Sequence, residues 1–313
     1  MTFGVFIDGE AGTTGLQIRS RLAHRSDIRL IRLDVSVRKD PEARIEAMRE
    51  ADVSILCLPD AAAADIAGRL SPSEARLIDA STAHRVDPDW VFGFPELAPA
   101  RRARVADAAR VSNPGCYSTG AIALLSPLVE AGVIAPDAPL SINAISGYTG
   151  GGKAKIEAIE SGETDGAFVY GLEQHHKHVP EIMLYGGLSK RPVFVPSVGA
   201  FAQGMIVQIP LPFLPSARRR LIETALRDAY ADASFVSVLA SDAYGARLDP
   251  RRVNGTNRLE LSVQGDDETG CLVLVAVLDN LGKGASGAAV QNLNIMLGLD
   301  ETTGLDAQSP QGA

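Results

Sequence analysis

The chain has 313 residues, a length that favours two domains over one. Apolar residues make up 46% and charged residues 22%, which is typical of a globular protein and excludes disorder for most of the chain. The 30 Lys and Arg residues against 38 Asp and Glu residues leave a net charge of -8, so there is no general basic field for nucleic acid or an anionic membrane. A small anionic ligand therefore requires a local basic pocket.

The sequence also disfavours membrane-spanning and disulfide-stabilised classes. No apolar run approaches the ~20 residues of a membrane span, and the N-terminus has the pattern of a strand and turn rather than a signal peptide. The 3 cysteines include no Cys-x-x-Cys pair, which argues against a disulfide framework and a structural zinc site. We therefore expect a cytoplasmic protein that binds neither membranes nor nucleic acid and holds no metal.

Predicted strands and helices alternate through the first part of the chain. Apolar runs predict strands at 3–8, 28–33, 53–58 and 76–79. Helical stretches are expected at 16–22, 41–50 and 61–70. This repeated strand–helix–strand pattern predicts a parallel sheet of the α/β class.

From Cys116 onward the pattern changes to one helix, expected at 116–131, and then to strands joined by short turns. The apolar runs that predict these strands lie at 139–146, 192–201, 204–211, 258–264 and 271–279. We expect an α+β domain at 116–279 with a largely antiparallel sheet. The glycine-rich loop and helix that follow are expected to pack on the first domain, which then comprises 1–115 and 280–313.

A glycine-rich loop follows the first predicted strand. Gly9, Gly12 and Gly15 form a Gly-x-x-Gly-x-x-Gly pattern that includes Thr13 and Thr14. Glycines permit a tight turn and a close backbone approach, while the unpaired N–H groups and dipole of a helix start attract phosphate. The loop predicts a dinucleotide pyrophosphate site; a plain tight turn is the alternative interpretation.

Among the cysteines, only Cys116 has the sequence setting of a nucleophile. Cys57 and Cys271 lie inside apolar strand patterns, which indicates small buried residues without a chemical role. Cys116 begins a predicted helix, where the helix dipole and free N–H groups favour a thiolate and could bind an oxyanion. A helix-starting cysteine without a role is the alternative.

A histidine cluster occupies 175–178. A metal site is one interpretation, but no HExxH or Cys/His pattern accompanies it and Lys177 would repel a cation. A polar turn before a helix is another. The favoured interpretation is a proton-transfer base, so the chain contains, in order, a cofactor loop, a thiol and a histidine. These are the parts of an NADP-linked aldehyde dehydrogenase that acts through a thioester.

Five segments together resemble the compact subgroup of the N-acetyl-gamma-glutamyl-phosphate reductase family. They are DGEAGTTG at 8–15, DASTAHR at 79–85, SNPGCYSTGAI at 112–122, HHKHVPEI at 175–182 and DNLGKGASGAAVQNLN at 279–294. The resemblance spans nearly the whole chain. It implies an NADP-binding Rossmann domain and an α+β catalytic domain like that of semialdehyde and glyceraldehyde-phosphate dehydrogenases.

The resemblance also implies the reaction, in which NADPH reduces the acyl phosphate N-acetyl-L-glutamyl 5-phosphate to the 5-semialdehyde with release of phosphate, in arginine biosynthesis. By its match to the family motif, Cys116 would be the nucleophile. His178 is the first choice for the acid and base, and His176 the second. A homodimer or homotetramer is expected, and the role of the segment 150–153 stays open.

Residues from the same segments are expected to bind substrate and cofactor. Arg85 is the expected phosphate partner, with an ordinary surface arginine as the alternative. The other expected substrate-binding residues are Ser81, Asn113 and Glu181. Beyond the glycine loop, the expected cofactor-binding residues are Ser36, Arg38, Asn280, Lys283 and Gly284.

The choice between NAD and NADP rests on the end of the second predicted strand. Asp34 stands near the position where an acidic side chain binds the ribose 2′-hydroxyl of NAD. Ser36, Arg38 and Lys39 supply the hydroxyl and cations that a 2′-phosphate needs, and relatives of the family use NADP. We therefore predict NADP(H), with Asp34 turned away to cap its turn.

Three rivals stay open. Aspartate-semialdehyde dehydrogenase uses the same chemistry on a shorter acyl phosphate, and the His-x-His-x-Pro-Glu motif argues against it. A reductase of aminoadipyl phosphate held on a carrier protein would want a basic docking face. A non-catalytic NADP-binding regulator belongs to another class, and the presence of Cys116 and both histidines counts against it.

Overall fold

The computed structural model describes residues 2–164, 166–211 and 218–305. They form two compact units, the first made of Met1–Gly115 with Ala285–Leu305 and the second of Cys116–Gly284. The chain thus enters the second unit at Cys116 and returns to the first at Ala285. Residues 280–284, assigned to the first domain from the sequence, lie in the second unit, and 306–313 fall outside the described residues.

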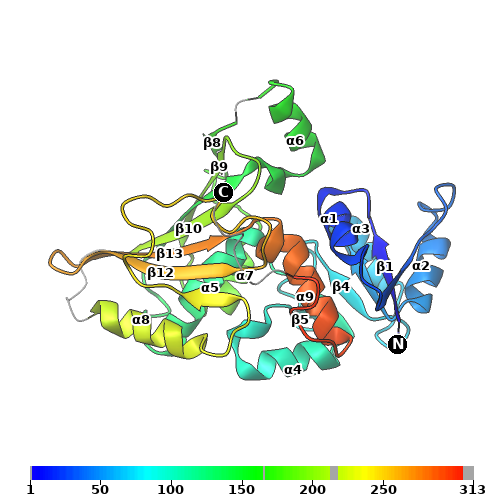
Figure 1. The fold of residues 1–313 in the computed structure, drawn as a ribbon, viewed down its shortest axis with the longest axis horizontal. Helices are drawn as coiled ribbons and strands as arrows, with labels where there is room; N and C mark the ends of the chain where they lie inside the picture. Colours follow the sequence, from blue (N-terminus) through cyan, green and yellow to red (C-terminus); the bar gives the residue numbers. More distant parts are fainter. Residues whose placement is uncertain (1, 165, 212–217, 306–313) are drawn as a thin grey trace. The chain divides into compact units, whose positions relative to one another are not determined.

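The first unit contains a six-stranded sheet in the order β2-β1-β3-β4-β6-β5, with every pairing parallel, so the predicted α/β architecture is confirmed (Figure 1). Its strands are β1 (Phe3–Asp8), β2 (Ile28–Ile31), β3 (Val53–Leu56), β4 (Leu77–Asp79), β5 (Val91–Phe92) and β6 (Arg110–Ser112). Its helices are α1 (Thr13–Leu22), α2 (Pro41–Glu50), α3 (Asp60–Gly68), α4 (Pro99–Asp107) and α9 (Gly287–Met296), with a 3₁₀ turn at Pro95–Leu97.

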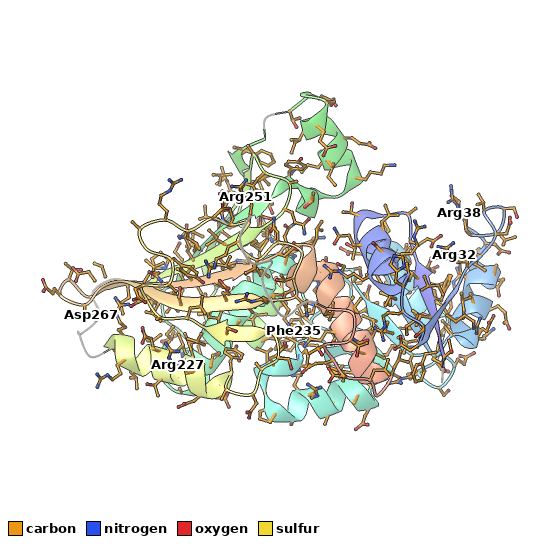
Figure 2. The ribbon with its side chains drawn as sticks, viewed as in Figure 1. Arg32, Arg38, Arg227, Phe235, Arg251 and Asp267 are labelled. Atoms are coloured by element: carbon orange, nitrogen blue, oxygen red, sulfur yellow. The ribbon has the colours of Figure 1, made fainter. Side chains whose placement is uncertain are left out.

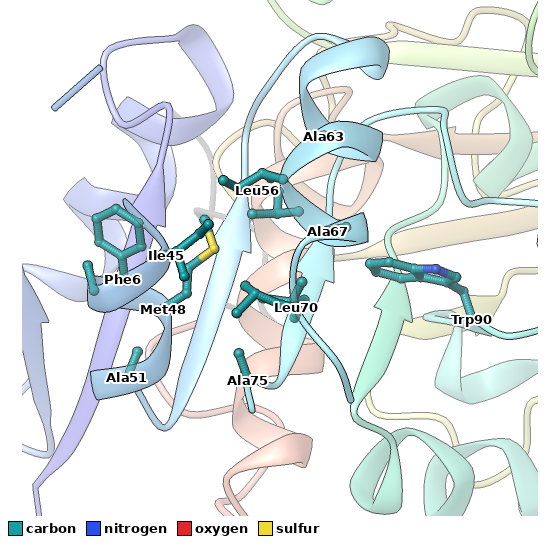
Figure 3. Close-up of a cluster of buried hydrophobic side chains, with 13 residues drawn as sticks. Phe6, Ile45, Met48, Ala51, Leu56, Ala63, Ala67, Leu70, Ala75 and Trp90 are labelled. Carbon is teal, nitrogen blue, oxygen red and sulfur yellow. The ribbon is translucent and has the colours of Figure 1, made fainter. Parts of the chain in front are cut away.

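The apolar faces of α2 and α3 build the core on one side of this sheet (Figure 3). Met48 from α2 and Ile66 from α3 are 0% and 1% exposed and pack with Leu56 of β3. On the other side α9 contacts β3 and β4, as expected from the sequence. This arrangement brings the carboxyl ends of the parallel strands to one edge, where α/β sheets bind their ligands.

Two boundaries near that edge differ from the predictions. The second strand ends at Ile31 rather than at 33, because the Asp34 carboxylate accepts the backbone N–H and the hydroxyl of Ser36 at 2.9 and 2.6 Å and so starts a turn. The first helix starts at Thr13 rather than at 16. The helix therefore begins inside the glycine loop itself.

The second unit contains a seven-stranded sheet in the order β11-β12-β13-β10-β7-β9-β8. Its strands are β7 (Ser141–Gly147), β8 (Phe168–Val169), β9 (Val193–Gly199), β10 (Met205–Leu211), β11 (Val236–Val238), β12 (Leu259–Asp266) and β13 (Cys271–Leu278). Its helices are α5 (Cys116–Glu130), α6 (Lys153–Glu160), α7 (Val179–Tyr185) and α8 (Arg218–Ala229), with a 3₁₀ turn at Tyr148–Gly151.

The sheet of the second unit is largely antiparallel, as expected, but two of the six strand pairings among its described residues are parallel. β7 pairs with β9 and β11 pairs with β12 in parallel, whereas β10 and β13 pair with their neighbours antiparallel. Parallel strands require a long crossover, and the chain between β7 and β9 supplies it through α6 and α7. The apolar runs predict the strands but do not encode which of them become neighbours.

One face of this sheet is covered by α5, which contacts β10, β12 and β13 and in turn packs against α7 and α8. The helix α5 is apolar and largely buried along its whole length. It is therefore held firmly, and its first residue is fixed with respect to α7. Among the described residues, none of the helices combines the length and apolar character that spanning a bilayer requires.

Candidate active site

Cys116 is the first residue of α5, as predicted. Its side chain is half-buried. At a helix start the first backbone N–H groups have no intrahelical acceptor and the positive end of the dipole favours an anion. The local structure therefore suits a thiolate, and the same N–H groups could stabilise the oxyanion of an attacked carbonyl.

Gly284 lies directly against this residue. A Cβ added to Gly284 would stand 2.8 Å from the Cβ of Cys116, a separation that real side chains do not show. The backbone N–H of Gly284 donates to the carbonyl oxygen of Asp279 at 3.0 Å. The Asp279 carboxylate is fully buried and accepts from the Gln203 side chain and from the N–H groups of Gly255 and Leu281. A buried network thus fixes the backbone beside the thiol.

The two candidate histidines form a pair in the same unit. Their ring centroids lie 4.8 Å apart in an edge-to-face arrangement, and Nδ1 of His176 accepts the backbone N–H of His178 at 3.2 Å. That contact places the hydrogen of neutral His176 on Nε2. His178 is 6% exposed and stands directly before α7, while Glu181 is 1% exposed in the first turn of that helix.

A cage of aromatic rings connects this pair with the start of α5. The ring of Tyr117, the residue next to Cys116, lies 5.9 Å from His176 and 5.8 Å from His178. The rings of Phe194 and Tyr170 lie 4.9 and 5.6 Å from His176. None of these three aromatic residues was predicted to lie beside the histidines, because their proximity to His176 depends on the crossover that brings β9 beside β7.

The two tyrosine hydroxyls form a short chain of hydrogen bonds. Tyr170 donates to Tyr117 at 3.2 Å, and Tyr117 donates to the carbonyl oxygen of Ser197 at 3.1 Å. Burial raises the pKa of Tyr117 and raises the pKa of Tyr170 to about 12, and the charge of Cys116 adds to both shifts. Both hydroxyls therefore keep their protons at neutral pH.

The other two cysteines are less buried than predicted, and Cys57 is half-buried and lies just after β3 rather than within it. Burial raises the pKa of Cys57 to about 12, helped by the negative charges of Asp79 and Asp8, so this thiol stays protonated. Cys271, expected to be buried, is exposed, because it is the first residue of β13 and precedes the apolar run that packs in the core.

The loop that carries the histidines is held by Gln174, which was not among the predicted site residues. Its side-chain amide donates to the carbonyl oxygen of Phe194 at 2.9 Å and accepts the N–H of Phe194 at 3.0 Å. Its backbone has a φ of 62°, a conformation that costs a non-glycine residue energy. The Gln174 side chain therefore makes the two hydrogen bonds to Phe194 that the backbone of a neighbouring strand would make. These bonds hold the chain in place two residues before His176.

Ser81, Arg85 and Asn113 come together in the first unit, at the ends of β4 and β6. The Ser81 hydroxyl donates to Asp79 at 2.7 Å, and Nε of Arg85 donates to the carbonyl oxygen of Asn113 at 3.0 Å. The Asn113 amide donates to the carbonyl oxygen of Ala285 at 2.9 Å. Arg85 is 7% exposed, so the alternative of a surface arginine is wrong.

The predicted dinucleotide loop has the geometry of an anion site. Gly9 has a φ of +85°, and a Cβ there would lie 2.3 Å from the carbonyl oxygen of Cys57, so only glycine fits. Thr13, Thr14 and Gly15 form the first turn of α1, after Gly12 as N-cap, and no described side chain caps this end. Their N–H groups are therefore oriented for a phosphate.

A cavity of about 460 Å³ adjoins this loop in the first unit. Apolar side chains, among them Ile31 and Leu58, form part of its lining, and Arg32, Arg38 and Lys39 contribute cations. Arg44, Asp8 and Glu10 line it as well, and Arg44 pairs with Asp8 at 2.5 Å. Figure 2 shows Arg32 and Arg38 on the segment that follows β2. Ser36 is not among the residues that line this cavity, and its hydroxyl donates to Asp34.

The remaining predicted cofactor residues lie in the second unit. The Asn280 side chain is 1% exposed, accepts the N–H of Gly204 at 2.8 Å and donates to the Thr149 hydroxyl at 3.1 Å. Lys283 is also 1% exposed, and its ammonium lies 5.6 Å from the centroid of the Phe235 ring. Within the ranges 2–164, 166–211 and 218–305, no group of three His, Cys, Asp or Glu side chains is placed to hold a metal ion.

Comparison with known proteins places these features in a family. Residues 32–105 match the model "Semialdehyde dehydrogenase, NAD binding domain" and residues 116–280 match "Semialdehyde dehydrogenase, dimerisation domain". An N-acetyl-gamma-glutamyl-phosphate reductase of Burkholderia orbicola is 52% identical over 303 residues, which cover 94% of this chain and 97% of that protein. The chain belongs to the N-acetyl-gamma-glutamyl-phosphate reductase family.

Further relatives agree with this family membership. The N-acetyl-gamma-glutamyl-phosphate reductase of Brucella anthropi is 50% identical over 308 residues, covering 94% of this chain and 98% of that one. Aspartate semialdehyde dehydrogenase II from Vibrio cholerae shares the fold, with a TM-score of 0.71 at 16% identity over 95% of this chain and 99% of that one. An aspartate semialdehyde dehydrogenase with NADP from Candida albicans has a TM-score of 0.68 at 16% identity, again over 95% and 99%.

Gln174 gives a test of how the family's histidine motif is positioned in this chain. Gln174→Glu keeps the side-chain length but replaces the N–H donor with an oxygen that faces the Phe194 carbonyl. Because loss of such a bond leaves a partner unsatisfied, we expect kcat for acyl phosphate reduction to fall roughly 10- to 100-fold. Steady-state kinetics measure this change. Gln208→Glu, an exposed position on β10, is the matched control and should keep full activity. Wild-type kcat in Gln174→Glu would contradict a positioning role.

Proposed function

We propose that the chain catalyses the NADPH-dependent reduction of N-acetyl-L-glutamyl 5-phosphate to N-acetyl-L-glutamate 5-semialdehyde, with release of phosphate, in arginine biosynthesis. The observation that carries this proposal is the position of Cys116 at the start of α5, next to Tyr117 whose ring contacts both His176 and His178. Relatives that bear this reductase's name are 50–52% identical over nearly the whole chain. The three cysteines, none in a disulfide, fit a reducing cytoplasm.

In the first step the Cys116 thiolate attacks the acyl carbonyl. A carbon–sulfur bond forms, the carbon–oxygen bond to phosphate breaks, and the phosphate leaves with the electron pair of that bond. The N–H groups at the start of α5 stabilise the transient oxyanion. The product of this step is a thioester on Cys116.

In the second half-reaction, reduction of the thioester gives a thiohemiacetal anion, which takes up a proton and collapses to aldehyde and thiol. We assign the acid and base to His178, since the Nδ1 atom of His176 is occupied by the His178 backbone and His176 is enclosed by aromatic rings. His176 then orients its neighbour. Glu181, buried in the first turn of α7, supports the same loop.

The dinucleotide site is proposed to lie along the glycine loop and the adjoining cavity. The residues fit the group, because an uncapped helix start suits a pyrophosphate and three cations suit a ribose phosphate. Bound NADPH would supply the hydride. We assign the 2′-phosphate to Arg38 and Lys39, with Arg32 beside them, and leave Asp34 the task of capping its own turn. Ser36 has no direct role in this assignment.

The remaining contacts are assigned by the family motifs. Arg85, held by the main chain of the first unit together with Ser81 and Asn113, is proposed to meet the substrate phosphate. Asn280, Lys283 and Gly284, in the second unit, are proposed to bind the cofactor. The matched family model is described as a dimerisation domain, so we propose that the second unit forms a homodimer or homotetramer.

The reverse reaction tests the substrate assignment. Phosphate-dependent reduction of NADP⁺, followed by absorbance, should proceed with N-acetylglutamate semialdehyde and be at least tenfold slower with aspartate semialdehyde. Cys116→Ser should abolish turnover in the same assay, since a hydroxyl is too weak an acid to ionise at a helix start. Equal or greater activity on aspartate semialdehyde would contradict the substrate assignment. Residual turnover of Cys116→Ser above a hundredth of wild type would argue against a thioester.

The acid and base assignment makes a second prediction. His178→Ala should lower kcat by ~10²–10⁴, the usual contribution of a positioned general acid or base, and should remove the imidazole limb from the pH dependence of kcat. His175→Ala, at an exposed position of the same loop, is the control and should behave as wild type. If kcat of His178→Ala kept the pH dependence of wild type, the acid and base would be His176 instead.

Cofactor choice rests on Arg38. Replacing it with alanine should weaken NADPH binding roughly 10- to 100-fold through loss of a charged hydrogen bond and leave NADH binding nearly unchanged. Fluorescence titration with the two cofactors measures both. Arg104→Ala, at an exposed position of α4 outside the cavity lining, should change neither affinity. An equal loss of affinity for both cofactors, or a wild-type preference for NADH, would mean that Asp34 binds the ribose 2′-hydroxyl.

A further inference from the structure

The helix α6 stands beside β8 and β9 at one edge of the sheet of the second unit (Figure 1). It follows the glycine run 150–152 and contributes no buried residue. One side chain of α6, that of Lys155, contacts two aromatic rings. Its ammonium lies 4.5 Å from the centroid of the Phe168 ring and 5.3 Å from that of Tyr170.

Two lysines of α6 differ sharply in their surroundings. The Lys153 side chain is 75% exposed and pairs with Glu157 at 3.7 Å, as an ordinary surface lysine does. Lys155 is partly buried, and within the described part of the chain no carboxylate lies at ion-pair distance from it. Aromatic faces attract a cation but accept no conventional hydrogen bond. The three N–H donors of Lys155 are thus available for an anionic ligand.

Tyr170 links Lys155 with the residues around the thiol. Its ring contacts the ammonium, its hydroxyl donates to Tyr117, and its pKa is raised by the charge of Cys116 as well as by burial. A single aromatic side chain therefore stands between Lys155 and the neighbours of Cys116. The cation lies at the far end of that ring system rather than at the nucleophile.

We propose that Lys155 binds the α-carboxylate of the acyl substrate. This assignment rests on the proposed function, which supplies a substrate with two anionic ends. The phosphate leaves from the carbon that the thiolate attacks, so it must lie close to Cys116. The α-carboxylate carbon is four carbon–carbon bonds away from that carbon, so the two anionic ends of the substrate need separate partners. Lys155 is a cation that lies beyond Tyr170 and Tyr117 from the thiol, which suits the carboxylate end.

Steady-state kinetics in the reverse direction separate the possible roles, because the semialdehyde, phosphate and NADP⁺ are varied independently. Lys155→Met should raise KM for N-acetylglutamate semialdehyde roughly 10- to 100-fold, the worth of a hydrogen bond between charged groups. It should leave KM for phosphate and for NADP⁺ within about twofold. Lys155→Arg should restore most of the loss, and Lys153→Met should match wild type. A rise in KM for phosphate, or a fall in kcat with every KM unchanged, would overturn the proposal.

A modified substrate tests the same contact from the other side. The α-carboxamide of N-acetylglutamate semialdehyde lacks the negative charge, so wild type should handle it as poorly as Lys155→Met does, while Lys155→Met should no longer distinguish carboxylate from carboxamide. Independent losses from the two changes would contradict a direct contact. If wild type instead turned over aspartate semialdehyde at least as fast as N-acetylglutamate semialdehyde, the proposed function would fail. The comparison of Lys155→Met with Lys153→Met on that α-carboxylate substrate would still decide the role of Lys155.

Discussion

Cys116 begins α5 in direct contact with Gly284, and much of the candidate site in the second unit depends on this contact. The thiol of Cys116 can occupy that position only because Gly284 has no side chain, since a Cβ there would lie 2.8 Å from the Cβ of Cys116. The Gly284 backbone depends in turn on Asp279, whose carboxylate is fully buried and satisfied by three donors. Loss of any of these contacts would leave a buried charge poorly compensated.

The two candidate histidines, by contrast, are surrounded by aromatic rings. Tyr117, Tyr170 and Phe194 enclose His176, and the Nδ1 atom of His176 accepts the backbone N–H of His178. The strained turn at Gln174 supports the same loop through two hydrogen bonds to Phe194. A cost in backbone energy beside the reaction centre is typical of functional sites.

The sequence predicts local features well because they depend on neighbours along the chain. The helix start at Cys116, the bounds of α2 and the tight turn at Gly9 all follow from residues within a few positions. The parallel pairing of β7 with β9 does not, since it depends on a crossover of two helices, and the aromatic cage depends on that pairing. The positions of Gln174 and Lys155 in the site could not be predicted for the same reason, because their partners lie on other elements.

Trapping the covalent intermediate tests the account most directly. Enzyme mixed with N-acetylglutamate semialdehyde and NADP⁺ in phosphate-free buffer, quenched in acid and examined by peptide mass spectrometry, should carry one N-acetylglutamyl group on the peptide that contains Cys116. One equivalent of NADPH should form in a burst, and added phosphate should discharge the adduct. A burst without an adduct, or an adduct on Cys57 or Cys271, would contradict the assignment of Cys116 as the nucleophile.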